Sequence, residues 1–277
     1  MINSTEYISS KLAAPEGLTL YLLLDGAAFN NILSFIYETE DQPEWRALYS
    51  NTFYETAIEV SPYLIKTNPV SSLFNWFIAE GYPKGLLVRS CQNIDKLGRH
   101  LQTNLEAKLP SLEIVLFRFY DPLIFDTYIR HITDDDAQRF CGPISEITWN
   151  FDDSFFSFVH VADPESPIDE DPIEISDNCY GELIKESLFR YAKELKLFNE
   201  QNLPALSTGK DLSYYVDIIK YARDRNVKTD SGIKLYSLVA SKSQSTPALA
   251  DKIVAIMDNS SLLELEKLVQ LRPFASL

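Results

Sequence analysis

Three charged residues in the first half of the chain, Asp25, Arg118 and Asp121, have the types and positions from which an active site could be built. Asp25 follows an apolar segment of strand character at residues 18–24, and the other two lie at the end of a second such segment at 112–119. Two carboxylates at strand ends can act as general acid and base or hold a metal ion. With the arginine, they would suit a hydrolase or phosphotransfer enzyme built at the carboxyl ends of adjacent strands.

The same residues also fit a structural role, which the local sequence favours. Arg118 and Asp121 are close enough in sequence to pair or to cap a turn, and Pro122 ends the strand because it has no N–H. Asp25-Gly26 is a common way to turn from a strand into a helix, with the aspartate as the cap. The chain lacks the G-x-S-x-G, G-x-G-x-x-G and zinc-ligand patterns. We therefore predict no catalytic residue, no metal and no cofactor.

A second short motif, FCGP at residues 140–143, follows about twenty residues later. Its glycine and proline join the strand-end residues as candidates for binding a partner or shaping a site, and the set is Asp25, Gly26, Arg118, Tyr120, Asp121, Pro122, Gly142 and Pro143. A nucleophilic pair of Cys141 with His131 or His160 is an alternative, but the sequence gives it no orienting third group. The three cysteines show no C-x-x-C spacing, which indicates reduced thiols.

The elements expected to position these residues alternate between strands and helices before residue 163. Strands are predicted at residues 18–25, 85–89 and 112–119, and helices at 27–37 and 93–108, the latter capped by Asn93 and ended by Pro110. Residues 144–149 and 155–161 are expected to form a hairpin across 150–153. Strands separated by helices predict an α/β fold, here a layered lobe with a mixed sheet at residues 1–162.

Residues 163–177 differ in composition from their surroundings. This segment contains seven acidic residues, three prolines and no basic residue, so we expect an extended, poorly buried linker or loop. Its acidic residues lack the spacing and the glycine of a calcium-binding loop.

Residues 178–277 are predicted to form a smaller, all-helical lobe. Apolar residues recur at helical intervals over 179–197 and 211–225. Two more helices are indicated by Thr246-Pro247, a cap followed by proline, and by Ser261-x-x-Glu264, a capping box.

Charge separates the chain into two regions. The formal net charge is −15, with 28 acidic and 11 basic residues in 1–177 but 12 acidic and 14 basic residues in 178–277. This balance disfavours nucleic acid and anionic lipid as partners, and the difference suits two surfaces for two partners. The first residues lack the pattern of a secretory signal, and no apolar run approaches the roughly 20 residues that span a bilayer. We therefore expect a cytoplasmic protein without membrane insertion.

Several short motifs, taken in order, resemble the effector adaptors of type VI secretion over roughly residues 18–145. They are LYLLLDGA at 20–27, Trp45 with Leu48-Tyr49, SPYL at 61–64, GLLVRS at 85–90, FRFYDP at 117–122 and FCGP at 140–143. Ser61 stands where the family usually has glycine, and Cys141 where it more often has an aromatic residue. The resemblance implies a non-enzymatic cytosolic adaptor, or chaperone, that binds one secreted effector and helps load it onto the VgrG spike.

Two other functional classes remain as alternatives. One is the hydrolase or phosphotransfer enzyme that would use Asp25, Arg118 and Asp121. The other is an immunity protein whose acidic surface blocks a basic toxin site.

Overall fold

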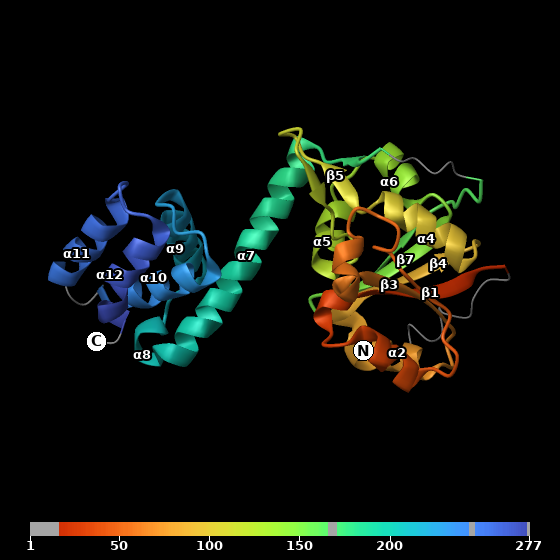
Figure 1. The fold of residues 1–277 in the computed structure, drawn as a ribbon, viewed down its shortest axis with the longest axis horizontal. Helices are drawn as coiled ribbons and strands as arrows, with labels where there is room; N and C mark the ends of the chain where they lie inside the picture. Colours follow the sequence, from red (N-terminus) through yellow and green to blue (C-terminus); the bar gives the residue numbers. More distant parts are fainter. Residues whose placement is uncertain (1–16, 166–170, 244–246, 276–277) are drawn as a thin grey trace. The chain divides into compact units, whose positions relative to one another are not determined.

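The chain contains an α/β part followed by a helical part (Figure 1). The computed structural model describes residues 17–165, 171–243 and 247–275. Their contacts divide the chain into two compact units, Met1–Leu183 and Ile184–Leu277. The predicted fold class, an α/β lobe followed by a smaller helical lobe, is confirmed.

A six-stranded sheet forms the centre of the first unit, in the order β2-β3-β1-β4-β7-β8. Every pair of neighbours in this sheet runs antiparallel. The strands are β1 (Thr19–Asp25), β2 (Trp45–Ala47), β3 (Pro62–Thr67), β4 (Gly85–Ser90), β7 (Ile144–Phe151) and β8 (Ser154–Val159). The predicted strands at 18–25 and 85–89 are therefore correct.

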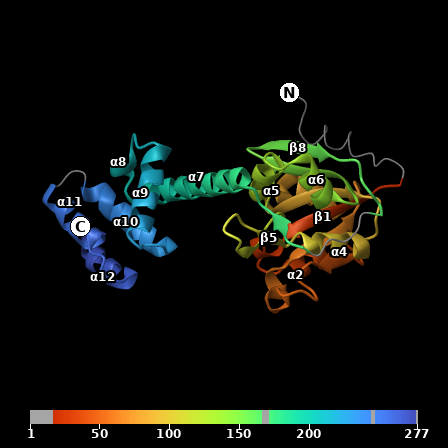
Figure 2. The same cartoon turned by 90° about the horizontal axis from the view of Figure 1, so that it is seen from above.

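β1 lies inside this sheet and is buried on both faces. Tyr21 and Leu23 belong to one apolar cluster, whereas Leu20, Leu22 and Leu24 belong to another, as expected for side chains that alternate along a strand. The first cluster is closed by α4 (Ile94–Thr103), α5 (Pro122–Ile129) and α6 (Asp134–Cys141), and the second by α2 (Ile32–Thr39) and α3 (Ser72–Trp76). Figure 2 shows the same unit from above.

A second, three-stranded sheet supplies the mixed pairing. Its order is β6-β5-β9, with β5 (Glu106–Lys108) antiparallel to β6 (Ile114–Leu116) and parallel to β9 (Ile173–Glu174). The predicted helix at 93–108 is thus too long, because α4 ends at Thr103 and β5 follows. The predicted strand at 112–119 is also too long, because β6 ends at Leu116.

The acidic segment 163–177 is not exposed throughout. Residues 166–170 lie outside the described residues, but Ile173 and Ile175 are buried, with exposures of 3% and 5%. The Ile175 N–H also donates to the Lys108 carbonyl at 3.0 Å. The expectation of a poorly buried linker is therefore wrong for its second half, because these two isoleucines enter the core of the first unit.

One of the two helices predicted before residue 110 is interrupted near its start, and the other begins where predicted. The helix expected at 27–37 is divided into a 3₁₀ turn, Gly26–Ala28, and α2, whose N-cap is Asn31. Asn93 caps α4 as predicted, and its side chain accepts from the Lys96 N–H.

The second unit is built from the later part of α7 (Asp177–Asn202) and five further helices around one apolar cluster. They are α8 (Pro204–Ser207), α9 (Leu212–Asp224), α10 (Asp230–Ser243), α11 (Pro247–Asp258) and α12 (Glu264–Ala275). The buried Lys267 of α12 donates to the carbonyls of Arg225 and Met257, both at 2.8 Å. It therefore links α12 to the ends of α9 and α11.

The two helix caps predicted in this unit were Thr246 and Ser261. Thr246 lies outside the described residues. The capping box at Ser261 is wrong, because α12 begins at Glu264 and the Glu264 carboxylate instead accepts from the N–H and hydroxyl of Thr229. None of the described helices is both long enough and apolar enough to cross a membrane.

The β7–β8 hairpin turns through two aspartates, which allows a test of the local fold. Asp152 and Asp153 have φ angles of 52° and 59°, the left-handed region that a two-residue hairpin turn requires and glycine tolerates best. Asp153→Gly is expected to raise the free energy of unfolding by about 0.5 to 1 kcal/mol, because relief of the left-handed conformation outweighs the entropy cost of glycine. Urea denaturation measures this change. The control Asp153→Ala removes the same charge but keeps a non-glycine residue at a positive φ angle, so it should lower stability. If both variants gained stability equally, the gain would come from the lost charge and not from the backbone conformation.

Candidate functional site

Asp25 and Arg118 form an ion pair across 93 residues of sequence. The Arg118 Nη2 lies 2.5 Å from the Asp25 Oδ2, and the Asp25 Oδ1 accepts from the Ala27 N–H at 3.1 Å. Burial alone would lower the pKa of Arg118, but the neighbouring carboxylate outweighs it and raises that pKa. The Arg118 guanidinium therefore stays charged, and the ion pair fixes the end of β1 to the turn that follows β6.

Gly26, the next residue, touches the backbone of the segment that leads into β3. Its N–H donates to the Ser61 carbonyl at 3.1 Å, and a Cβ on Gly26 would lie 2.1 Å from that oxygen. The Ser61 hydroxyl in turn accepts from the Tyr49 N–H at 3.0 Å. Ser61 thus contributes hydrogen bonds from both its backbone and its side chain to this junction.

Two buried tyrosines continue the cluster. The phenol oxygens of Tyr49 and Tyr120 are 2.8 Å apart, and the Arg118 guanidinium lies 5.9 Å from the centre of the Tyr120 ring. Burial raises the pKa of both tyrosines, so both phenols remain protonated. We call Asp25, Gly26, Tyr49, Ser61, Arg118 and Tyr120 the anchor cluster.

Asp121 and Pro122 form the start of α5. The Asp121 side chain accepts from the Leu123 N–H at 3.0 Å, and proline occupies the first turn. This confirms the predicted turn cap. The rival geometry, in which Asp25, Arg118 and Asp121 lie at the ends of adjacent strands, is wrong: Asp25 ends a strand of the large sheet, whereas Arg118 follows β6 of the small one.

Exposed apolar side chains lie beside the anchor cluster, and no sequence pattern predicted them. Phe53 is 88% exposed, and its ring contacts Tyr54, which packs against Tyr49. Val60, 45% exposed, immediately precedes Ser61. With the Arg118 side chain, which is 42% exposed, they place apolar surface and a cation around a buried, hydrogen-bonded centre. Such a surface is suited to contact with another protein.

The first unit also has a cleft of about 750 Å³, and its lining includes Asn51 and Glu59, which are close in sequence to Phe53 and Val60. It is lined by both aromatic and polar residues: Asn30, Asn31, Ile32, Leu33, Trp45, Arg46, Ala47, Ser50, Asn51, Ile58, Glu59 and Tyr63. The rings of Trp45 and Tyr63 pack with centroids 5.5 Å apart.

Gly142 and Pro143 lie at the opposite end of the sheet from the anchor cluster. The Pro143 carbonyl accepts from the Ser90 hydroxyl at 2.8 Å, and Ser90 pairs with Thr19, at the other end of β1 from Asp25. Gly142 has φ 48°, and a Cβ there would lie 2.6 Å from the His100 ring. The eight candidate residues therefore form two separate groups.

The cysteines and histidines give no support for a nucleophilic pair. Cys91 is exposed, whereas Cys141 and Cys179 are buried, and burial raises the pKa of Cys141 to about 12. The His131 ring hydrogen bonds to the Thr127 carbonyl at 2.7 Å. Within the described ranges, no group of three or more His, Cys, Asp or Glu side chains is arranged to hold a metal ion.

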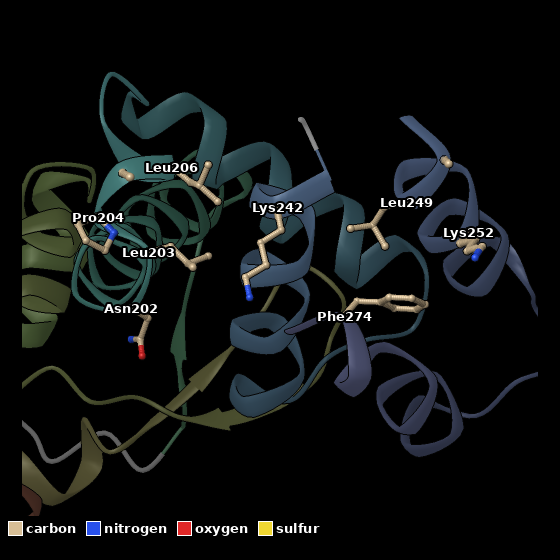
Figure 3. Close-up of a pocket in the computed structure, with 10 residues that line it drawn as sticks. Asn202, Leu203, Pro204, Leu206, Lys242, Leu249, Lys252 and Phe274 are labelled. Atoms are coloured by element: carbon tan, nitrogen blue, oxygen red, sulfur yellow. The ribbon is translucent and has the colours of Figure 1, made fainter. Parts of the chain in front are cut away.

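The second unit has a cleft of its own, of about 740 Å³ (Figure 3). Most of its lining is apolar, with two lysines: Asn202, Leu203, Pro204, Ala205, Leu206, Lys242, Ala248, Leu249, Lys252 and Phe274. The Lys242 Nζ is bound to the Ala275 carbonyl at 2.6 Å. Its lining includes none of the predicted site residues.

Comparison with known proteins gives one result. A family model described as a domain of unknown function (DUF4123) matches residues 20–139, which include β1 except its first residue, the whole anchor cluster and most of α6. The match ends before Phe140 and excludes the second unit. Neither a curated protein nor a solved structure matches the chain.

Close packing at Gly26 generates a stability prediction. Gly26→Ala places a methyl group against the Ser61 carbonyl, so we expect a loss of about 1 to 3 kcal/mol in the free energy of unfolding. Gly181→Ala is the matched control: it has open space around it in α7, and alanine favours helix. An unchanged stability in Gly26→Ala would contradict the proposed close contact.

His100 generates a pH prediction. Burial lowers its pKa, although its hydrogen bond to the Phe140 carbonyl opposes the shift. The unfolded chain therefore takes up a proton below about pH 6.5 that the folded chain resists, and stability is lost as pH falls. His100→Gln should lose less stability between pH 7.5 and 5.5 than the wild type, by up to about 1.4 kcal/mol. Urea denaturation at both pH values measures this, and parallel losses would refute it.

Proposed function

We propose that this chain is a cytosolic, non-enzymatic adaptor of type VI secretion that binds one effector and helps load it onto the VgrG spike. The observation that carries the proposal is the family match over residues 20–139, a family associated with type VI effector adaptors. The motifs on which the resemblance rests lie largely inside that range, and the fold brings several of them into one cluster.

The contacts of the charged residues support a binding role over catalysis. Both carboxylate oxygens of Asp25 accept hydrogen bonds, one from Ala27 and one from Arg118. Asp121 caps α5. Asp25 and Asp121 therefore both make local structural contacts, which supports a role in positioning the chain.

The surroundings of the anchor cluster support contact with a protein partner. Phe53 and Val60 expose apolar surface beside a buried, hydrogen-bonded centre. Rigid support under an exposed aromatic side chain lowers the entropy lost on binding. An adaptor of this kind holds the effector until competing contacts with the spike favour its release.

The difference in charge along the chain supports two partner surfaces. Residues 1–177 are strongly acidic, whereas 178–277 are nearly balanced. Effector and spike would then engage different parts of the protein, and loading would not require one site to bind both.

Affinity purification from the native cytosol, with mass spectrometry, tests this function. The wild-type chain should recover one effector, with or without the VgrG spike. Phe53→Ser should reduce effector recovery at least tenfold while the thermal midpoint is unchanged, because its side chain is solvent-exposed.

The control for this experiment is Val70→Ser, which changes an equally exposed side chain, 87%, between β3 and α3. It should recover the effector normally. Recovery of no effector by the wild type would refute the adaptor function, whereas normal recovery by Phe53→Ser would refute only the surface assigned to it.

A further inference from the structure

β8 is an outer strand of the large sheet, and one of its sides is unpaired in the described part of the chain. It is last in the strand order and lies at the outside of the first unit (Figure 2), and within the described parts of the chain its backbone pairs only with β7. A strand in this position presents a row of N–H and C=O groups that can pair with another strand.

The register identifies which groups face outward. The His160 N–H donates to the Ser145 carbonyl at 2.9 Å, and the same pairing continues as Phe158 with Ile147 and Phe156 with Trp149. In an antiparallel pair, hydrogen-bonded positions alternate with positions whose backbone groups point away. The backbone groups of Phe155, Ser157 and Val159 therefore point away from β7.

β8 lacks the features by which proteins protect open edges. Its sequence, SFFSFV, has no lysine, no proline and no other charged residue, and its pairing with β7 has no bulge. Val159 is 74% exposed and Phe156 is 37% exposed, on opposite faces of the strand. An added strand would cover apolar surface on both faces.

The charge around β8 indicates what kind of strand would fit. Asp152 and Asp153 lie exposed at its start, and Asp163 and Glu165 lie exposed shortly after its end. The uncharged strand therefore has acidic residues near both ends. A second copy would bring like charges together in a chain of net charge −15, whereas a strand with lysine or arginine near its ends would be attracted.

We propose that β8 binds an extended segment of the effector by strand addition, through the outward groups of Phe155, Ser157 and Val159. The segment has alternating apolar residues and basic residues near its ends. Main-chain hydrogen bonds supply affinity, and Val159 and Phe156 contact alternate side chains. This inference rests on the proposed function, since it names a second contact with the effector in addition to the surface around Phe53.

Amide hydrogen exchange in the isolated ¹⁵N-labelled protein tests the open edge without any effector. The N–H groups of Phe155, Ser157 and Val159 should exchange at least tenfold faster than those of Phe156 and Phe158, which bond to β7. Equal protection of both sets would show that another part of the chain or a second copy already covers β8. That outcome would overturn the inference, and light scattering would identify a second copy by its mass.

Two variants then test the effector that co-purifies with the wild-type chain. Ser157→Pro removes an outward N–H and leaves the β7 ladder intact, because proline is tolerated where an edge N–H faces solvent. Val159→Lys adds a positive charge at an exposed position facing the basic partner. Each should weaken effector binding at least tenfold, and Val70→Lys is the matched control.

The outcomes separate this inference from the proposed function. Weaker binding by both folded variants, with the control unchanged, supports strand addition. Full binding by Val159→Lys and by folded Ser157→Pro overturns it but leaves the adaptor function standing. If the wild type recovers no effector, both the adaptor function and the effector segment proposed for β8 are refuted. This holds even if fast amide exchange shows that the outer side of β8 is unpaired.

Discussion

The burial of β1 on both faces is the constraint on which the first unit depends. Its five apolar residues divide between two clusters, so helices must cover the sheet on each side. The strand then ends in a carboxylate that is only 7% exposed, and a buried charge needs partners. Arg118 and the Ala27 N–H supply them, while Gly26 allows the chain to pass against Ser61. The anchor cluster thus follows from the way the central strand ends.

The sequence predicted elements whose signals are local. β1 is a continuous apolar run, α4 has an asparagine cap, and the β7–β8 hairpin has turn residues between alternating segments. β5 and β9 were not predicted because strands of three and two residues are too short to show an alternating pattern. β9 also lies in a segment so acidic that its two isoleucines did not indicate a buried strand. The Asp25–Arg118 pair joins residues 93 apart, and its existence depends on tertiary packing that no local pattern encodes. The cap at Asp121 was predictable because aspartate followed by proline is a common start of a helix.

The candidate site also shows why residue types alone were ambiguous. Asp25, Arg118 and Asp121 suit either catalysis or structure by residue type, and only the structure shows which groups each of them contacts. Gly142 and Pro143 resembled parts of the same site but lie at the other end of β1, beside Ser90. Phe53 was missed because an exposed phenylalanine has no pattern that distinguishes it from a buried one. Its significance comes from the aromatic contacts that connect it through Tyr54 to Tyr49.

Lys267 has a consequence for how the helical unit opens. Its amine is bound to the carbonyls of Arg225 and Met257, at the ends of α9 and α11, while its own helix packs in the same core. Fraying of either helix end would leave a buried amine short of an acceptor, which is costly. The three helices are therefore expected to unfold as one cooperative segment. Because the side chain is only 2% exposed, acylating reagents would reach this amine only in the open state, making it an internal reporter of that transition.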